Sequence, residues 1–460
     1  MNLAKIHSVY FIGIGGIGMS ALARYFHRIG KNVAGYDRVS KQLTNELIEE
    51  GIDIHFIDSP NLVPEKFLNS SHTLVVYTPA IAAQNRELHY FTNSGFTLMK
   101  RAQVLGLLSK ELTTLAVAGT HGKTSVSSFT THILNQTEEK CNAFLGGISK
   151  NLGSNVALHP EAKRVVIEAD EFDRSFLTLY PDLALITTLE EDHLDIYGDR
   201  IQLEEAFTQF VSQIKRKGIL ILHQQVQLVA PEKSELKIFT YSIEGSTADY
   251  RVENIRIEEG RFCFDVVVPG ERWSDFELYL PGRINVENAL AAISMAHQTG
   301  VPQEAIRKGV RSFTGVQRRF DYHIRTAHLI YLDDYAHHPT ELRRTLTSIR
   351  ELYPDRKITG IFQPHLYSRT RDFAKGFGEA MNLCHHAVVL DIYPAREDPI
   401  PGVSSELIYE HIESTDKILL HKEDLLAYVK ATEFDVLITM GAGDIDRYVK
   451  PIKLILEQRL

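Results

Sequence analysis

The sequence has few cysteines and no pattern among them. Its 460 residues include 3 cysteines, Cys141, Cys263 and Cys384, which are odd in number and far apart. Zinc sites and disulfide frameworks need closely and regularly spaced cysteines, so neither is expected here. Isolated thiols are typical of proteins in a reducing compartment, and the sequence therefore predicts a cytoplasmic protein.

An excess of positive charge and a long apolar run are also missing. Lys and Arg total 50 against 59 for Asp and Glu, which gives a formal net charge of −9. Nucleic-acid binding needs a basic surface, so nucleic acid is not expected as a partner. Residues 1–8 are polar, and the apolar stretch behind them is short and interrupted by glycines. We therefore expect neither a signal peptide nor a membrane span, and no membrane as a partner.

The chain does have the composition and length of a globular protein with several domains. Its residues are 44% hydrophobic and 24% charged, as in ordinary soluble proteins. A length of 460 residues corresponds to roughly three domains. From the elements discussed below, we expect domains at residues 1–103, 104–312 and 313–460. A monomer and a homodimer both stay open.

The most informative motif is a glycine-rich turn in the middle of the chain. Residues 119–125 read Gly-Thr-His-Gly-Lys-Thr-Ser and follow the apolar run 115–118. Glycines let backbone N–H groups approach phosphate oxygens, and the next helix directs its positive end at them. Lys123 would reach the β- and γ-phosphates of ATP, and the hydroxyl of Thr124 would hold Mg²⁺. Val117 replaces the first glycine of the usual pattern, so this is a compact variant; a turn without a ligand is the alternative.

A second glycine turn lies near the N-terminus. An apolar run at 9–12 leads into Gly13-Ile14-Gly15-Gly16-Ile17-Gly18, and a second predicted strand ends at Asp37. This is the G-x-G-x-x-G turn of a βαβ unit, with an acidic residue placed to bind a ribose. The geometry suits any diphosphate. A further strand, 73–77, ends in residues 78–80, which we expect at the same crevice.

Two strand ends in the middle segment carry acid and histidine. Residues 164–167 lead into Glu168, and residues 183–187 lead into a stretch with His193. In a parallel sheet these ends open on the same edge as the phosphate loop. A carboxylate and an imidazole there could bind Mg²⁺, whereas acidic residues such as Glu171 could equally cap helices.

The remaining segments continue this pattern. Residues 236–280 alternate in the manner of strands, which predicts a small antiparallel insert. Asn285 and Asn288 share a helical face, where their amides could read an adenine edge or cap the helix. Further on, two predicted strands end in the polar runs 333–340 and 363–371. Polar residues gathered at strand ends are typical of a site, although helix capping and solvation are alternatives.

Together these residues resemble one family. The turn 119–125, Glu168, the acidic run 190–195, the helix start 281–289 and the run 333–340 occur in the order and spacing of the Mur ligases. These are ATP-dependent amide-forming enzymes of peptidoglycan precursor synthesis. The resemblance covers essentially the whole chain and implies three α/β domains. These are an N-terminal Rossmann-like domain for a UDP-sugar, a central P-loop ATPase-like domain with a parallel sheet, and a C-terminal Rossmann-like domain.

The resemblance also implies substrates. Residues 11–20, 333–341 and 363–372 are similar to those of members that join L-alanine to the carboxylate of UDP-N-acetylmuramate. Related members of the family attach a preformed tripeptide to the same sugar nucleotide, and we expect them to differ at 13–20 and 363–371. ATP and Mg²⁺ would be the cofactors.

The family motifs assign roles to individual residues. The implied UDP-sugar contacts are Gly13, Gly15, Gly16, Gly18, Met19, Ser20, Asp37, Thr78, Pro79 and Ala80. The implied ATP contacts are Gly119, Thr120, His121, Gly122, Lys123, Thr124, Ser125, Asn285, Asn288, Arg319, Asp334 and His337. Thr124, Glu168 and His193 would arrange magnesium, and Lys123, His365 and Arg369 would be catalytic. Tyr335, His365 and Arg369 would face the amino acid.

The chain departs from the family pattern at informative positions. Leu366 stands where many alanine-adding members have a basic residue, and Thr188 stands where asparagine is frequent. No lysine lies between residues 195 and 214, so the carbamylated lysine of several relatives is absent. Recognition of the amino-acid carboxylate would then fall to Arg369, together with Arg371.

Two functions from other classes account for parts of the chain. An NAD-dependent oxidoreductase would explain the turn 13–18 and Asp37, but it would leave the phosphate loop unused. A P-loop regulatory NTPase would explain the central segment alone and would not need the polar runs at 333–340 and 363–371.

Overall fold

The computed structural model describes residues 3–78, 81–82, 84–172, 174–190, 197–228, 235–244, 247–395 and 397–460. Contacts divide the chain into two compact units. Unit 1 consists of Met1–Asn254, Phe264–Phe276 and Asn288–Phe313, and unit 2 of Ile255–Cys263, Glu277–Glu287 and Thr314–Leu460. Within the described ranges, no helix is long and apolar enough to cross a membrane.

Unit 1 begins with a parallel five-stranded sheet whose strand order is β3-β2-β1-β4-β5. Side chains alternate between the two faces of a strand. On one face of β1 (Ser8–Ile12), Phe11 contacts Phe26 of α1 (Ile17–Arg28). On the other face, Tyr10 contacts Phe91 of α3 (Arg86–Asn93). The other elements are β2 (Asn32–Tyr36), α2 (Gln42–Glu49), β3 (Asp53–His55), β4 (Thr73–Tyr77), β5 (Thr97–Lys100) and α4 (Arg101–Glu111).

A second sheet has ten strands in the order β15-β14-β13-β12-β11-β10-β6-β9-β7-β8. Its centre is β6 (Thr113–Ala118), which pairs in parallel with β9 (Arg164–Glu168) and with β10 (Leu183–Ile186). The carboxyl ends of these three strands therefore lie at one edge, as the sequence predicts. The helices are α5 (Lys123–Leu134), α7 (Arg200–Ser212), α8 (Arg283–Gln298) and α9 (Gln303–Ser312). The flanking strands are β7 (Cys141–Ser149), β8 (Ser154–Ala157) and β11 (Ile219–His223).

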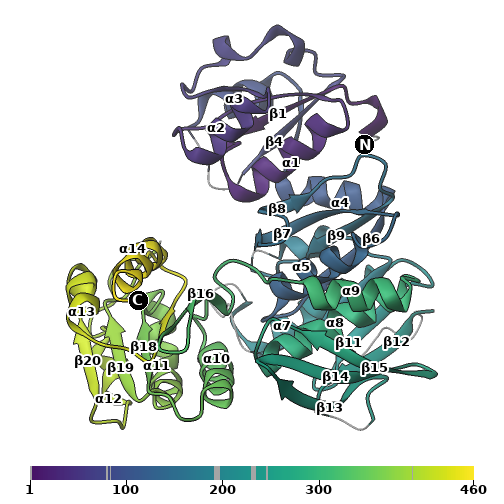
Figure 1. The fold of residues 1–460 in the computed structure, drawn as a ribbon. Helices are drawn as coiled ribbons and strands as arrows, with labels where there is room; N and C mark the ends of the chain where they lie inside the picture. The colour runs from purple at the N-terminus through teal and green to yellow at the C-terminus, as the bar shows by residue number, and fades with distance from the viewer. Residues whose placement is uncertain are drawn as a thin grey trace. The chain divides into compact units, whose positions relative to one another are not determined.

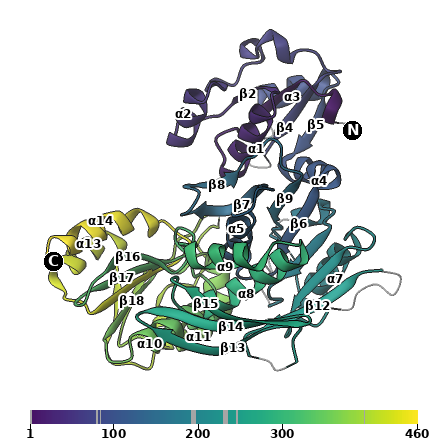
Figure 2. The ribbon, with the colours of Figure 1, turned by 45° about the vertical axis from the view of Figure 1, so that its right-hand side comes forward.

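The strands predicted at 236–280 extend this second sheet. They are β12 (Lys237–Ser242), β13 (Tyr250–Glu258), β14 (Arg261–Val268) and β15 (Glu271–Leu278). β12 pairs in parallel with β11, and β13 to β15 follow it in order toward the sheet edge (Figure 2). The predicted turn lies between β13 and β14, where Glu259 and Gly260 both have positive φ.

Unit 2 is built around a six-stranded sheet in the order β16-β17-β21-β18-β19-β20. In the described part of this sheet, β16 (Asp321–Arg325) pairs antiparallel with β17 (Ile330–Asp334), and the other strand pairs are parallel. Helices cover both faces: α10, α11 and α12 pack on one core, and α13 and α14 on the other (Figure 1). The remaining bounds are α10 (Pro339–Leu352), β18 (Ile358–Phe362), α11 (Tyr367–Met381), β19 (His386–Leu390), α12 (Glu406–Glu410), β20 (Lys417–Leu420), α13 (Leu425–Ala431), β21 (Val436–Met440) and α14 (Asp446–Glu457).

Candidate nucleotide and substrate sites

The phosphate loop joins β6 to α5 through two glycines in the left-handed region. Gly119 has φ +124° and Gly122, the residue before α5, has φ +83°. A Cβ on Gly119 would lie 2.2 Å from Oγ1 of Thr187, so a larger residue would not fit. The half-buried Ser125 follows in the first turn of α5.

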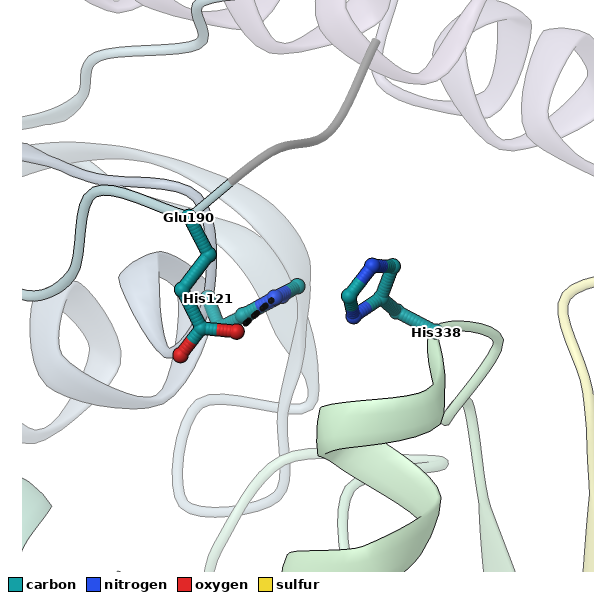
Figure 3. Close-up of side chains that lie close together, drawn as sticks. All are labelled: His121, Glu190 and His338. Atoms are coloured by element: carbon teal, nitrogen blue, oxygen red, sulfur yellow. Dashed lines mark ion pairs between the residues drawn. The ribbon is translucent and has the colours of Figure 1, made fainter. Parts of the chain in front are cut away.

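Two threonines after β10, Thr187 and Thr188, form hydrogen bonds with the phosphate loop. The hydroxyl of Thr188 accepts the backbone N–H of His121 at 3.0 Å and pairs with the hydroxyl of Thr120 at 2.9 Å. The hydroxyl of Thr187 donates to the carbonyl of His121. The His121 ring also forms an ion pair with Glu190, with 3.6 Å between Nε2 and Oε2 (Figure 3). Thr188, a departure from the family pattern, is thus part of the loop's support.

Lys123 is held by a buried carboxylate. Its Nζ donates to the carbonyl oxygen of Gly119 at 2.7 Å and to Oε1 of Glu171 at 2.8 Å. Burial opposes the charge of Lys123, but Glu171 and Asp170 outweigh it and raise the lysine pKa. Burial raises the pKa of Glu171, which is fully buried, to about 7. Glu171 is therefore the counter-ion of Lys123, which the sequence did not indicate.

Two of the three predicted magnesium ligands lie together. Oγ1 of Thr124 donates to Oε1 of Glu168 at 2.8 Å, and the backbone N–H of Gly146 donates to Oε2 of the same carboxylate at 2.7 Å. A hydroxyl and a carboxylate side by side fit Mg²⁺, which prefers oxygen ligands. His193 lies outside the described residues.

The two asparagines predicted to bind adenine lie in the first turns of α8. A Cβ on Gly122 would lie 3.3 Å from Oδ1 of Asn288, so this amide is beside the phosphate loop. The amide of Asn285 donates to the carbonyl of Pro281 at 2.7 Å, just before the helix. Asn285 therefore bonds to the segment before its own helix, Asn288 lies beside the phosphate loop, and the adenine contact of both stays a prediction.

The N-terminal glycine turn is also closely packed. Gly13 has φ +86°, and a Cβ there would lie 2.5 Å from Cγ2 of Thr78. The N–H of Gly15 donates to Oδ2 of Asp37 at 2.7 Å. Asp37 thus braces the turn itself, and its contact with a ribose stays a prediction. Gly16, the residue before α1, has more space: the nearest atom to a Cβ there is 3.6 Å away.

The predicted UDP-sugar contacts also include two residues within α1, Met19 and Ser20. Met19 and Ser20 are buried within α1, and the Ser20 hydroxyl donates to the carbonyl of Ile17 at 3.0 Å. Pro79 and Ala80 lie outside the described residues.

In unit 2, Asp334 shapes the chain after β17. Its two carboxylate oxygens accept the backbone N–H groups of Phe320 and Ala336, both at 2.8 Å. Burial raises the pKa of Asp334 to about 6, although Arg319 acts against it. The guanidinium of Arg319 lies 4.8 Å from the centre of the Tyr335 ring. The strand end therefore brings three predicted site residues together.

The paired histidines have different roles. His338 is the residue before α10, drawn at the start of that helix in Figure 3, and its Nδ1 accepts the N–H of Thr340 at 3.4 Å. His337 instead contacts the carbonyl of Tyr335 through Nδ1 at 2.9 Å, and its ring centre lies 6.2 Å from that of His365. The capping alternative holds for His338, whereas His337 and His365 form a candidate site.

The two arginines predicted to recognise the amino acid, Arg369 and Arg371, lie in different environments after β18. Leu366 is buried and has a positive φ of 71°, and its N–H donates to the carbonyl of Tyr393 at 3.0 Å. Arg369 is buried in the first turn of α11. Arg371 is exposed, and its Nε donates to Asp372 at 2.7 Å. Arg369 stays the candidate for the amino-acid carboxylate, and Arg371 is engaged elsewhere.

Sequence reasoning missed a polar network at the same sheet edge. The Gln363 amide donates to Asp444 at 2.8 Å, and Lys422 donates to the same carboxylate at 2.8 Å. Nε of Arg318 donates to buried Asp333 at 2.9 Å. Gln363 and Asp444 are 81 residues apart, so only their common position after strand ends could have signalled the pairing.

Comparisons with known proteins agree with this geometry. Three family models match the chain: "Mur ligase family, catalytic domain" at residues 8–113, "Mur ligase middle domain" at 117–296 and "Mur ligase, glutamate ligase domain" at 318–443. A UDP-N-acetylmuramate–L-alanine ligase of Parabacteroides distasonis is 49% identical over 99% of this chain and 98% of that protein. The enzyme of the same name from Phocaeicola vulgatus is 47% identical over 100% of both. Among solved structures, the UDP-N-acetylmuramate-alanine ligase of Thermotoga maritima has a TM-score of 0.78 at 25% identity and covers 98% of this chain and 100% of that one.

Proposed function

The chain belongs to the Mur ligase family, and on this premise we propose that it uses ATP to join L-alanine to the carboxylate of UDP-N-acetylmuramate. The reaction forms a carbon–nitrogen bond in the cytoplasmic synthesis of peptidoglycan precursors. The observation that carries the proposal is the phosphate loop with Lys123 beside the Thr124–Glu168 oxygen pair. It stands in a chain whose relatives named for this reaction match over its full length. An oxidoreductase or a regulatory NTPase would leave one of the two glycine turns without a use.

The substrate carboxylate must be activated, because its leaving group would otherwise be oxide. Transfer of the γ-phosphoryl group of ATP gives an acyl phosphate, and the amine of L-alanine then attacks the acyl carbon and expels phosphate. Phosphoryl transfer depends mainly on positioning and on charge neutralisation. Lys123 would supply a positive charge to the phosphates. Its ammonium group would then replace its contacts with Gly119 and Glu171 by contacts with phosphate oxygens.

The oxygen pair of Thr124 and Glu168 would hold Mg²⁺, which neutralises charge on the phosphates when bound. Thr187 and Thr188 hold the loop backbone at Thr120 and His121, and the first N–H groups of α5 would meet the phosphates. The glycine turn at 13–18 serves the diphosphate of the UDP-sugar, as in the family, and not a nicotinamide cofactor.

In unit 2, we assign His365 and Arg369 to the amino acid. Arg369 is a buried guanidinium in the first turn of α11 and would pair with the carboxylate of L-alanine. The attacking ammonium must lose a proton, and the imidazoles of His365 and His337, 6.2 Å apart between ring centres, are the candidate acceptors. Leu366 supplies no second cation, so Arg369 carries this recognition.

The test is phosphate release from Mg-ATP in the presence of UDP-N-acetylmuramate. Three conditions are compared: L-alanine, the L-Ala-γ-D-Glu-diaminopimelate tripeptide, and no acceptor. Release that depends on L-alanine supports the proposal, and serine or glycine can then be tested against it. Release only with the tripeptide would make the protein a recycling ligase, and release without any acceptor would favour a regulatory NTPase.

A further inference from the structure

The N-terminal glycine turn has no cation of its own. Residues 13–20 read Gly-Ile-Gly-Gly-Ile-Gly-Met-Ser, whereas the phosphate loop contains Lys123. A helix N-terminus contributes about half a positive charge, less than a diphosphate carries in negative charge. Asp37 adds a negative charge at the turn, because a Cβ on Gly15 would lie 2.9 Å from its Oδ2. A diphosphate at this turn therefore needs a cation from elsewhere in the fold.

Arg101 lies against this turn. It is the first residue of α4, directly after β5, and α4 contacts α1. A Cβ on Gly18 would lie 2.8 Å from Cδ of Arg101, 2.9 Å from its Nη1 and 3.0 Å from its Nε. The third glycine of such turns usually allows close packing of the helix on the strand. Here it makes room for an arginine side chain across the first turn of α1.

The guanidinium of Arg101 is not engaged by the protein. It is half-buried, and no hydrogen bond, ion pair or ring contact joins it to any residue in the described ranges. Arg24, further along α1, shows the contrast: it pairs with Glu46 at 3.0 Å and with Glu50 at 2.8 Å. The first N–H groups of a helix also have no partner within the helix. An unpaired guanidinium and these N–H groups thus share one place, the first turn of α1.

We propose that Arg101 binds the diphosphate of the UDP-sugar, so that the site is shared between the N-terminus of α1 and an arginine on α4. The inference rests on the proposed function, because it takes a UDP-sugar as the ligand of the glycine turn. A guanidinium presents paired N–H donors in a plane, which matches two phosphate oxygens, and it stays charged at any physiological pH. Gly18 is then required for the room it leaves to Arg101.

The experiment is calorimetric titration of the full chain with UDP and with uridine. It compares the wild type with Arg101→Ala, Arg101→Lys and Lys100→Ala. Arg101→Ala should weaken UDP binding by about 10- to 100-fold, the range for a charged hydrogen bond, and leave uridine binding unchanged. Arg101→Lys should keep part of the affinity, because it retains the charge without the paired donors. Lys100 is the matched control: it is exposed and adjacent, so its loss should leave UDP binding unchanged.

The outcomes separate this inference from the proposed function. If the wild type binds UDP and Arg101→Ala binds it equally well, the inference is wrong and the proposed function stands. Equal losses for UDP and uridine would also overturn it, because the effect would then lie in the fold and not in the diphosphate. A wild type that does not bind UDP would contradict the proposed function itself.

Discussion

The two glycine turns of unit 1 are both proposed to bind phosphate groups, but they obtain the positive charge for this in different ways. Each follows a buried parallel strand, begins a helix and contains a glycine with positive φ. The phosphate loop contains its own cation, Lys123, which pairs with a buried counter-ion, Glu171, from the segment after β9. The N-terminal turn has no cation, is braced by Asp37, and is approached by Arg101 from another helix.

This difference follows the chemistry proposed for each turn. A triphosphate that reacts needs a cation fixed at the reacting phosphate, so the lysine belongs to the loop that forms the cradle. A diphosphate that does not react needs only to be bound, and a cation from a neighbouring helix is sufficient for binding. A local motif thus supplies the backbone geometry, while charge comes from the motif or from the tertiary fold.

The largest expected effect is that of Lys123→Ala, which removes the cation from one turn only. We expect formation of the acyl phosphate to fall by at least about 100- to 1,000-fold, the usual loss for one preorganised charge-stabilising donor. UDP affinity should be unchanged. Single-turnover assays and calorimetry measure the two quantities, and a parallel loss of UDP affinity would contradict the separation of the sites.

Gly119→Ala and Gly16→Ala compare the two turns directly. A Cβ on Gly119 would meet Thr187 Oγ1 at 2.2 Å in a backbone with φ +124°, so we expect a loss of roughly 2–4 kcal/mol in stability. Gly16 has φ −70° and no atom within 3.4 Å of a Cβ, so its replacement should cost under about 1 kcal/mol. Denaturant unfolding would measure the free energy of unfolding of both variants. Equal losses would show that the turns are not packed as described.

Gly146→Ala tests the magnesium side of the phosphate loop. A Cβ on Gly146 would lie 2.3 Å from Oε1 of Glu168, so the carboxylate must move away from Thr124. We expect the Mg²⁺ concentration needed for binding of a non-hydrolysable ATP analogue to rise by about 10-fold or more.

Two controls accompany that measurement. Binding of the analogue in EDTA should be unaffected by Gly146→Ala. In a Glu168→Asp background, where a shorter side chain leaves room for the new methyl group, Gly146→Ala should add little further loss. An unchanged dependence on Mg²⁺ would contradict the role given to this carboxylate.

The last expected effect depends on pH and concerns a second buried glutamate, Glu87, whose polar neighbours include Tyr10 and His55. Glu87 accepts the hydroxyl of Tyr10 at 2.7 Å and lies 3.4 Å from Nε2 of His55, and burial raises its pKa to about 7. The stability that Glu87 contributes is complete below its ordinary pKa of 4.5 and is lost as pH rises toward 7. Burial lowers the pKa of His55, which acts in the opposite direction below pH 6.5.

Glu87→Gln should therefore remove the fall in stability between pH 5 and 7. The difference from the wild type should be no more than about 3 kcal/mol, because burial raises the pKa of Glu87 from 4.5 to about 7. Thermal midpoints measured across this range provide the test. Identical pH profiles for both proteins would show that Glu87 does not hold a proton in the folded state.

Much of the fold could be predicted because parallel strands are buried on both faces. The apolar runs at 9–12, 115–118 and 358–362 lie in β1, β6 and β18, and each is followed by glycine or polar residues. Such strands read as short apolar runs between turn residues, which a local pattern reveals. The polar run 333–340 was less clear, because it mixes a capping histidine, His338, with site residues.

The contacts within the sites could be predicted only in part. Thr124 and Glu168 were expected together, since both follow neighbouring strands of one sheet. Gly146 was not expected there, because nothing in its local sequence shows that β7 lies beside β9. The pairing of Lys123 with Glu171 joins residues 48 positions apart, and Glu171 fitted a helix cap equally well in the sequence.

By itself, the sequence determined the two glycine turns, the strands and helices around them, and membership of the Mur ligase family. These features depend on spacing over a few residues, where backbone conformation and hydrogen bonding are local. The tertiary structure alone decided which charges meet at each turn: Glu171 at Lys123, Asp37 at Gly15 and Arg101 at Gly18. These contacts depend on the order of strands in the sheets and on the packing of helices. Both arise from interactions between distant segments, which produce no local pattern in the sequence.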